Sequence, residues 1–311
     1  MRIIFMGTPK FAAVSLQRLL QASLDIVNVV TVPDKPAGRG LHLQASAVKE
    51  LALQNNLSVL QPENLHDPDF ISALQAVRPD LIVVVAFRIL PEEVIKIPPR
   101  GTVNLHASLL PKYRGAAPIY WAIINGETET GLTTFYIRKT VDTGNIIDTV
   151  KVEIGPEMTT GELHDILADR GADLLLKTIR AIEQNRARAY IQNEALASKA
   201  PKIKHQDCQI NFNKPVQNVH NLIRGLSPFP AAFTYWQKKL IRLYSTRVVD
   251  LQKKDTPPGT IVDIINKEKL IIQCEPGWLE VREVQLESKK RMSVQEFLRG
   301  HALAVGERLV S

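Results

Sequence analysis

The sequence predicts an α/β protein in which a Rossmann-like parallel sheet is followed by a small β-barrel. Over the first two-thirds of the chain, short apolar runs alternate with stretches of helical spacing, which is typical of parallel strands joined by helices. The run at 80–87, D-L-I-V-V-V-A-F, is apolar almost throughout, as expected for a strand buried on both faces. From about residue 207, short β-rich runs between Pro and Gly turns replace this alternation. The length of 311 residues suits two such domains.

The N-terminal part opens on the apolar run at 3–6, which predicts a buried first strand. After the G-T-P turn at Gly7–Pro9, apolar residues between Phe11 and Leu20 recur at helical spacing. A β-branched run at 26–32 predicts the second strand. The pattern then predicts a helix at 46–54, a strand at 57–61, a helix at 68–76, strands at 80–87 and 103–106, and a helix around 118–124.

Residues 160–185 predict one long amphipathic helix, because a stripe of Leu and Ile recurs at helical spacing. Gly171 falls on that stripe and lowers the helix propensity there. The polar segment 191–206 contains Pro201 and three lysines and is interpreted as a linker. It separates a predicted domain of residues 1–190 from a second one of residues 207–311.

The second domain is expected to combine short strands with two helices, at 216–225 and 293–298. Ser293 is the expected N-cap of the later helix, with Glu296 three residues on. Turns such as D-T-P-P-G and E-P-G separate the β-rich runs. These runs lie at 233–236, 240–249, 259–265, 270–274 and 279–284.

Several function classes are disfavoured by patterns that the sequence lacks. The first turn, G-T-P-K-F-A, has no G-x-G-x-x-G, and no G-x-x-x-x-G-K-[ST] occurs, which argues against a nicotinamide dehydrogenase or an NTPase. Cys208 and Cys274 lie far apart, and the seven histidines have no metal-ligand spacing, so no metal is expected. No apolar run reaches about 18 residues and the N-terminus lacks a signal-cleavage pattern, so a cytoplasmic location is expected.

The charge is uneven along the chain. The net charge is +7, and residues 207–311 carry 16 Lys and Arg against 11 Asp and Glu. A smaller, more basic C-terminal part suits a polyanion such as RNA, although a basic solvated surface explains the same numbers.

The most informative stretch is 104–115, N-L-H-A-S-L-L-P-K-Y-R-G, followed by D-T-G at 142–144. Asn104 and His106 stand two apart in a segment that opens like a strand, so their side chains point the same way. One face then offers an amide and an imidazole to a single small volume. Pro111 and Gly115 punctuate the loop that follows, which also carries the cations Lys112 and Arg114.

This constellation resembles the formyltransferases that use 10-formyltetrahydrofolate as formyl donor. The resemblance implies that Asn104, His106 and Asp142 are the catalytic trio and that the substrate amine attacks the formyl group directly. In such a reaction Asn104 supplies an N–H to the oxyanion, His106 supplies a second one when protonated, and Asp142 orients the imidazolium. The carboxylate, or water beside it, is an alternative acceptor for the proton of the amine.

The same resemblance implies where the folate binds. The segment A-F-R-I-L-P at 86–91 stands where the family has A-Y-G-x-I-L-P, with Arg88 at the usual glycine and one residue fewer. Individual pterin contacts are therefore open at this point. The implied folate-binding residues are Phe87, Arg88, Ile89, Leu90, Ser108, Leu109, Leu110, Pro111, Thr143 and Gly144.

The acceptor is indicated by a further segment, P-D-K-P-A-G-R-G at 33–40. It resembles the loop that family members acting on methionyl initiator tRNA insert after their second strand, and it implies tRNA contacts from Lys35 and Arg39. S-P-F-P-A-A at 227–232 resembles the start of their barrel, which is of the oligonucleotide-binding (OB) type. Its basic residues Lys238, Lys239 and Arg242 are expected to contact the tRNA backbone. A monomer is expected.

The sequence leaves other interpretations of the function open. A formyltransferase acting on a sugar nucleotide is expected to lack P-A-G-R-G, and one acting on glycinamide ribonucleotide is expected to end near residue 200. A folate hydrolase of similar fold replaces the amine by water. A non-enzymatic RNA-binding protein leaves Asn104, His106 and Asp142 unexplained.

Overall fold

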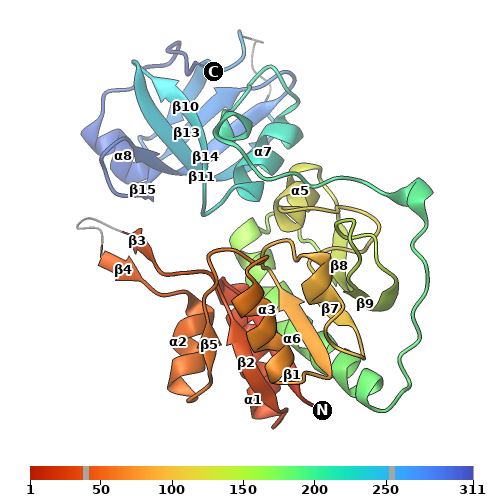
Figure 1. Ribbon diagram of the computed structural model, residues 1–311. Coiled ribbons are helices and arrows are strands. Elements are labelled where there is room, and N and C mark those ends of the chain that lie inside the picture. Colours follow the sequence, from red (N-terminus) through yellow and green to blue (C-terminus); the bar gives the residue numbers. More distant parts are fainter. Residues whose placement is uncertain (38–41, 252–255, 311) are drawn as a thin grey trace. The chain divides into compact units, whose positions relative to one another are not determined.

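The computed structural model describes residues 1–37, 42–251 and 256–310, and its contacts divide the chain into two compact units (Figure 1). Unit 1 comprises Met1–Ala116, Thr130–Val152 and His164–Ala200, and unit 2 comprises Ala117–Glu129, Glu153–Leu163 and Pro201–Ser311. Two segments from the middle of the chain thus group with the C-terminal part. The division at residues 190 and 207 stays a prediction.

Unit 1 is built on a seven-stranded sheet in the order β5-β2-β1-β6-β7-β8-β9. Neighbours from β5 to β7 pair in parallel, which confirms the Rossmann-like prediction, whereas β8 runs antiparallel to β7. The strands are β1 Ile3–Gly7, β2 Ile26–Val30, β5 Val59–Leu60, β6 Leu81–Val85, β7 Thr102–His106, β8 Glu129–Tyr136 and β9 Ile146–Glu153. A separate hairpin joins β3 Lys35–Ala37 to β4 His42–Gln44.

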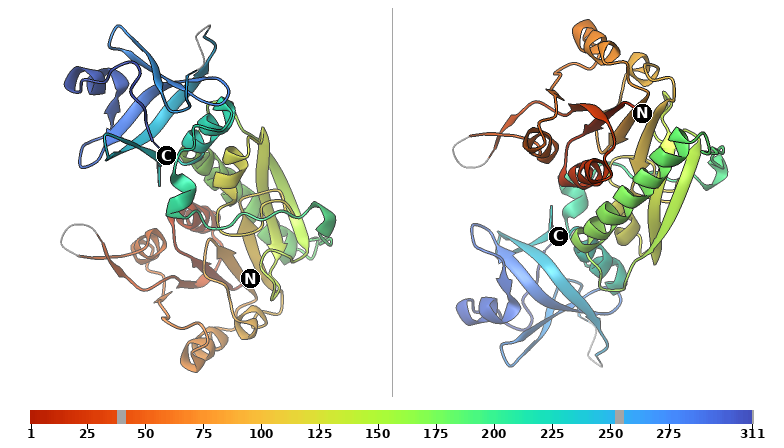
Figure 2. Two further views of the ribbon diagram at one scale, coloured as in Figure 1. Left: turned by 90° about the horizontal axis from the view of Figure 1, so that it is seen from above. Right: turned by 90° about the horizontal axis from the view of Figure 1, so that it is seen from below.

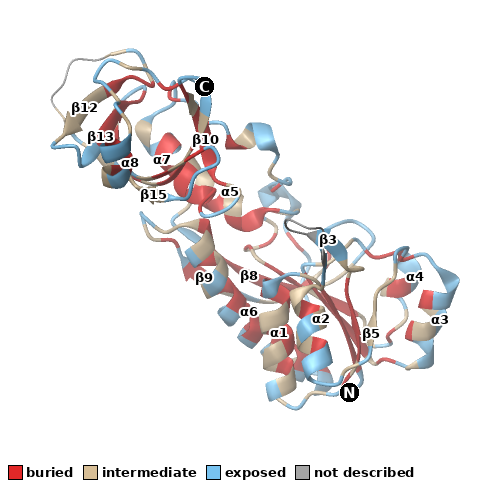
Figure 3. Cartoon of the chain, turned by 90° about the vertical axis from the view of Figure 1, so that its left-hand side faces the viewer, coloured by how far each residue is buried: buried red, intermediate tan, exposed pale blue. Residues whose placement is uncertain are grey.

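The helices of this unit are α1 Lys10–Gln21, α2 Ala47–Gln54, α3 Pro68–Ala76, α4 Glu92–Ile95 and most of α6 Thr160–Glu183. Phe70 and Leu74 of α3 and Val94 of α4 pack on one face of the sheet. On the other face, a Cβ at Gly171 of α6 would lie 2.9 Å from Leu105, so glycine permits the close approach of helix and sheet. Figures 2 and 3 show α6 along the sheet and the strands buried between half-exposed helices.

The register between β6 and β7 fixes which way the polar residues of β7 point. Val84 of β6 pairs with Asn104, and Val84 packs in the core that α3 and α4 cover. Because side chains alternate along a strand, Thr102, Asn104 and His106 lie on the face of α3 and α4, and Leu105 lies on the face of α6. The strand prediction for this stretch is therefore confirmed.

Unit 2 contains a mostly antiparallel six-stranded sheet, in the order β10-β11-β14-β13-β12 with β15 on β14. The strands are β10 Ala232–Trp236, β11 Lys239–Val249, β12 Ile261–Ile265, β13 Lys269–Gln273, β14 Trp278–Leu286 and β15 Met292–Ser293. The helices are α5 Pro118–Ile124, α7 Val216–Gly225 and α8 Val294–Gly300. Short 3₁₀ turns lie at Glu194–Leu196 in unit 1 and His205–Cys208 in unit 2.

The C-terminal segment joins the two edges of this sheet. Val310 exchanges backbone hydrogen bonds of 3.0 and 3.1 Å with Tyr235 of β10, and Ile261 of β12 donates to Glu307 at 2.8 Å. Both edge strands thus find partners, which protects their polar groups and gives the sheet its barrel-like character. Ser293 caps α8 in the expected box with Glu296, since each side chain accepts a hydrogen bond from the backbone N–H of the other residue.

Both cysteines are buried and unpaired, and burial raises the pKa of the Cys274 thiol to about 12. A thiol with such a pKa is inert toward oxidation at neutral pH. None of the helices within the described ranges is long and apolar enough to span a membrane.

Candidate active site

Unit 1 contains a pocket of about 110 Å³ over β6, β7 and the loop that follows β6. It brings the segment Phe87–Leu90 together with Asn104 and Asp142. The assignment of these residues to folate binding and catalysis stays a prediction. A larger hollow, of about 570 Å³, contains none of these residues. The lining consists of Val84, Phe87, Arg88, Ile89, Leu90, Ile95, Asn104, Phe135, Ile137, Arg138, Lys139, Val141 and Asp142.

Asn104 and His106 differ in how much of their bonding capacity the protein uses. The amide of Asn104 lines the pocket and makes no hydrogen bond to any described residue, so both its N–H groups are available to a ligand. His106 is 7% exposed, and its Nε2 lies 2.9 Å from the carbonyl oxygen of Tyr113. A carbonyl only accepts, so Nε2 carries a hydrogen and Nδ1 is the nitrogen free to gain or lose a proton.

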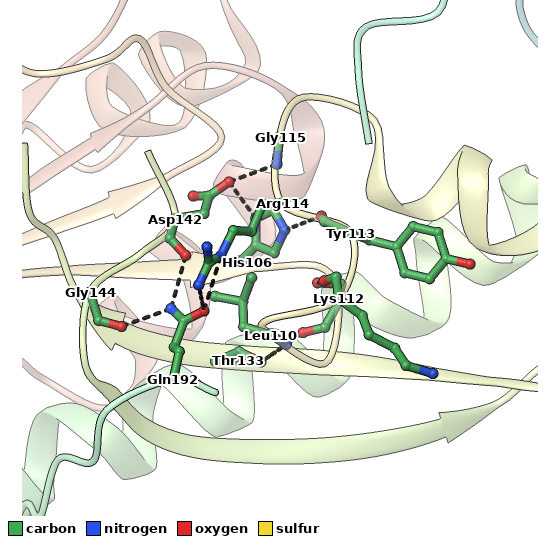
Figure 4. Close-up of polar contacts among 11 residues, drawn as sticks. His106, Leu110, Lys112, Tyr113, Arg114, Gly115, Thr133, Asp142, Gly144 and Gln192 are labelled. Carbon is green, nitrogen blue, oxygen red and sulfur yellow. Dashed lines mark hydrogen bonds and ion pairs between the residues drawn. The ribbon is translucent and has the colours of Figure 1, made fainter. Parts of the chain in front are cut away.

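Asp142 faces that free nitrogen. Its Oδ2 lies 3.8 Å from Nδ1 of His106 and accepts a 2.8 Å hydrogen bond from the backbone N–H of Gly115 (Figure 4). The backbone of Asp142 has φ +55°, a left-handed conformation that Asp tolerates better than most residues.

The loop between His106 and Gly115 is shaped by internal contacts. The Ser108 hydroxyl donates to the carbonyl oxygen of Lys112 at 2.6 Å, and Leu110 N–H donates to Thr133 Oγ1 at 3.1 Å. The Leu110 side chain packs against Phe135 and Ile146. The pocket lining therefore does not include Ser108, Leu109, Leu110 or Pro111. These residues instead stabilise the conformation of the loop.

Thr143 and Gly144 complete the D-T-G turn. The Thr143 hydroxyl donates to the carbonyl oxygen of Thr140 at 2.9 Å. A Cβ at Gly144 would lie 1.5 Å from the carbonyl oxygen of Tyr136, so only glycine fits here. The turn thus packs directly against Tyr136, the last residue of β8. This contact fixes the position of Asp142 relative to the pocket.

Arg88 explains how the shortened loop keeps its shape. Its guanidinium donates to the carbonyl oxygens of Pro62 and Glu63 at 2.7 and 2.9 Å and lies over the ring of Phe87. The loop after β6 is thereby tied to the segment Q-P-E-N at residues 61–64. The Nε–H of Arg88 is buried and has no hydrogen-bond partner among the described residues.

Arg88→Ala is expected to raise KM for a folate donor about 10-fold with little change in kcat, because two hydrogen bonds from a charged group are lost. Steady-state kinetics with the donor varied measures this. Arg88→Lys keeps the charge but cannot bridge two carbonyls in a fork, so it should resemble the alanine variant. An unchanged KM for the folate donor in both variants would show that the loop keeps its conformation without the hydrogen bonds of Arg88.

Sequence reasoning missed Gln192, which lies in the predicted linker. Its Nε2 donates to the carbonyl oxygens of Asp142 and Gly144, both at 2.8 Å. It also missed Arg138 and Lys139, two exposed cations at the pocket. A single sequence gives no signal for these residues, because the residues that they contact lie tens of positions away along the chain.

The residues predicted to contact tRNA lie in both units. Lys35 is exposed on the β3–β4 hairpin, and Arg39 lies outside the described residues. Lys238 and Lys239 are exposed at the turn between β10 and β11, where Lys238 has φ +65°. Arg242 lies on the face of β11 opposite the core residues Ile241 and Leu243.

No group of three or more His, Cys, Asp or Glu side chains within the described ranges has the geometry of a metal site. The pocket offers an amide, a carboxylate and cations, and the imidazole of His106 faces the carboxylate. These are the groups that acyl transfer to an amine requires: a donor for an oxyanion and an acceptor for a proton.

Comparison with known proteins agrees with this chemistry. Residues 1–179 match the family "Formyl transferase", and residues 202–302 match "Formyl transferase, C-terminal domain". Methionyl-tRNA formyltransferase of Acetivibrio thermocellus is 46% identical over 99% of each chain, and that of Desulforamulus reducens is 43% identical over 98% of this chain and 96% of its own.

Solved structures share the fold. The sugar 3N-formyl transferase WlaRD, determined with dTDP and 5-N-formyl-THF, has a TM-score of 0.67 at 22% identity and covers 93% of this chain and 99% of its own. HypX of Aquifex aeolicus, in complex with tetrahydrofolic acid, has a TM-score of 0.63 at 17% identity over 96% of this chain and 47% of its own. With both family models matched in order and relatives that are similar over nearly the full length, the chain belongs to the formyl transferase family.

Proposed function

We propose that this protein transfers the formyl group of 10-formyltetrahydrofolate to the free amino group of methionyl initiator tRNA, which yields N-formylmethionyl-tRNA for translation initiation. The proposed reaction type rests on the pocket that Asn104, Asp142 and the loop Phe87–Leu90 line. His106 does not line this pocket, but its Nδ1 faces Oδ2 of Asp142. The acceptor rests on relatives named methionyl-tRNA formyltransferase, which match almost the entire chain.

The pocket suits a folate donor. A pterin is flat and carries hydrogen-bonding groups along its edge, and the pocket combines apolar walls with the side-chain amide of Asn104, which makes no hydrogen bond to a described residue. Phe87, Ile89 and Leu90 are the apolar residues of the loop that would hold the ring. The exposed cations Arg138 and Lys139 would attract the carboxylates of the glutamate tail.

The catalytic roles follow from which atoms are free. The amine of the acceptor attacks the formyl carbon, the carbonyl oxygen becomes an oxyanion, and the bond to the folate nitrogen then breaks. Asn104 is positioned to donate an N–H to that oxygen. The Nε2–H of His106 is already bound to Tyr113, so direct donation from His106 to the oxyanion would require that bond to open.

We therefore assign His106 and Asp142 a shared proton. The open Nδ1 of His106 faces Oδ2 of Asp142 at 3.8 Å, a separation that a water or an acceptor amine can bridge. The pair accepts the proton that the attacking amine loses and returns it to the folate nitrogen as that nitrogen leaves. While it holds the proton, the ring places a positive charge near the developing oxyanion.

The test is formyl transfer from 10-formyltetrahydrofolate to methionyl initiator tRNA. Glycinamide ribonucleotide, an amino-sugar nucleotide and acceptor-free buffer run in parallel. Transfer to the tRNA alone supports the proposal. Transfer to a small acceptor would contradict the tRNA assignment and keep the chemistry, whereas folate turnover without acceptor would indicate a hydrolase.

Arg39→Ala is expected to raise KM for methionyl-tRNA about 10-fold or more, because a cation paired with phosphate or base edges contributes roughly 1–3 kcal/mol to nucleic-acid binding. Any slow hydrolysis of the donor without tRNA should be unchanged. Leu43→Ala, at an exposed position of β4, is the control. Equal loss of tRNA-dependent and tRNA-independent turnover would point to a folding defect and argue against the assignment.

A further inference from the structure

Gln192 is a buried amide in an exposed stretch. Gln192 is 5% exposed, whereas its neighbour Ile191 is 79% exposed. A buried amide is costly unless each of its polar atoms finds a partner. Gln192 uses its full capacity: Nε2 donates to two carbonyl oxygens, and Oε1 accepts from Nε and Nη2 of Arg114 at 3.1 and 2.6 Å (Figure 4).

The two carbonyl oxygens belong to Asp142 and Gly144, on either side of Thr143. One amide therefore clamps both ends of the turn that carries the proposed catalytic carboxylate. The φ of +55° at Asp142 is a conformation that surroundings must enforce. The Gln192 amide provides that enforcement from behind the turn, away from the Oδ2 atom that Gly115 and His106 face.

The acceptor side of the same amide reaches the other wall of the site. Arg114 lies between Tyr113, whose carbonyl oxygen binds His106, and Gly115, whose N–H binds Asp142. Its guanidinium also pairs with Glu194, which is the largest reason that the pKa of Arg114 is raised. Its backbone is held as well, since Arg114 N–H donates to the carbonyl oxygen of Ser198 at 2.8 Å.

We propose that Gln192 is a positioning residue that sets the distance between Asp142 and His106. It ties the turn of Asp142 to the loop Tyr113–Gly115, and this loop holds the hydrogen-bond partners of the His106 ring and of Asp142 Oδ2. The inference deepens the proposed formyl transfer and rests on it for its kinetic consequences. Gln192 thus supports the active site from within a segment that the sequence predicts to be a linker.

Gln192→Glu separates the two sides of the amide. The new carboxylate still accepts from Arg114, and with a formal charge it does so more strongly. Its second oxygen, however, faces the carbonyl oxygens of Asp142 and Gly144 and repels them, because an ionised carboxylate cannot donate. The turn is expected to move while the link to Arg114 remains. Glu194→Gln is the control: it weakens the other partner of Arg114, at a side chain that is 67% exposed and does not touch the turn.

The kinetic test is a double-mutant cycle with Asp142→Asn. Gln192→Glu alone should lower kcat about 30-fold with KM for donor and tRNA nearly unchanged, since displacing a catalytic group by about 1 Å costs up to 10²-fold. In the Asp142→Asn background the same change should cost less than about 3-fold, because Gln192 acts through Asp142. Glu194→Gln should keep most of the activity. Fully additive losses would mean that Gln192 only stabilises the fold, and would overturn the inference.

A crystal structure of Gln192→Glu gives a readout that does not depend on the reaction. The expected result is that Oδ2 of Asp142 no longer accepts from Gly115 N–H. A turn that stays in place overturns the inference, whatever the enzyme does. If the turn moves and the wild-type protein fails to formylate methionyl-tRNA, the proposed function fails and the positioning role of Gln192 stands.

Discussion

Replacing His106 with alanine is expected to lower kcat for formyl transfer by about 10²- to 10⁴-fold, the range that a positioned acid–base group contributes. The affinity for the folate donor should change little, because His106 is 7% exposed and is absent from the pocket lining. The alanine removes two things at once: the Nε2–H that binds Tyr113 and the Nδ1 that faces Asp142. Single-turnover kinetics, together with equilibrium binding of the donor, separates chemistry from binding.

His106→Gln tells these two losses apart. The glutamine amide can place an N–H near the position of Nε2 and so keep the hydrogen bond to Tyr113, but it has no group that titrates. If proton exchange at Nδ1 is the role of His106, the glutamine variant should be almost as slow as the alanine variant. Recovery of most of the activity by glutamine would contradict the shared-proton assignment and leave His106 with a structural part.

The control for loss of a buried histidine is His220→Gln. His220 is 2% exposed in unit 2, and its Nδ1 lies 3.0 Å from Thr246 Oγ1. Burial lowers its pKa and so favours the neutral ring. This variant should lower Tm as His106→Gln does while kcat stays close to that of the wild type. A similar fall in kcat would indicate that slow turnover merely reports a weakened fold.

Local sequence patterns predicted much of the fold. The apolar runs predicted the parallel strands, and the helical spacing at 68–76 and 216–225 matches α3 and α7 in full. These elements were predictable because each has one periodicity throughout its length. The strands β8 and β9 were missed. β8 contains Gly131, where a Cβ would lie 2.2 Å from the carbonyl oxygen of Val150, so tertiary packing and not strand propensity put glycine there.

The candidate site divides in the same way. Asn104 and His106 could be placed on one face from spacing alone, because a strand fixes the direction of every second side chain. Arg88 was visible as a departure from the family pattern, but its hydrogen bonds to Pro62 and Glu63 depend on a fold that brings together residues 26 and 25 positions apart. Gln192 lies 50 positions from Asp142 in a segment whose composition is that of a linker. Such contacts are properties of the folded chain, and no local period records them.

Asp142→Asn is expected to match His106→Ala in effect, with kcat lower by about 10²- to 10⁴-fold. Asn tolerates the left-handed backbone at φ +55° and can still accept the hydrogen bond from Gly115 through its amide oxygen. The variant should therefore fold and bind the donor normally. What it loses is the negative charge opposite Nδ1 of His106 and the oxygen atom that can take the proton of the amine. Asp148→Asn, which breaks an ion pair with the mostly exposed Lys177, is the matched control.

The double variant His106→Gln with Asp142→Asn tests whether the two residues share one proton. Groups that act as a unit show strongly non-additive losses, so the double variant should be hardly slower than the slower single variant. Its residual rate above the uncatalysed reaction then measures what Asn104 and substrate positioning contribute on their own. If the two losses multiply instead, His106 and Asp142 act at separate steps, and the 3.8 Å between Nδ1 and Oδ2 is a distance without catalytic meaning.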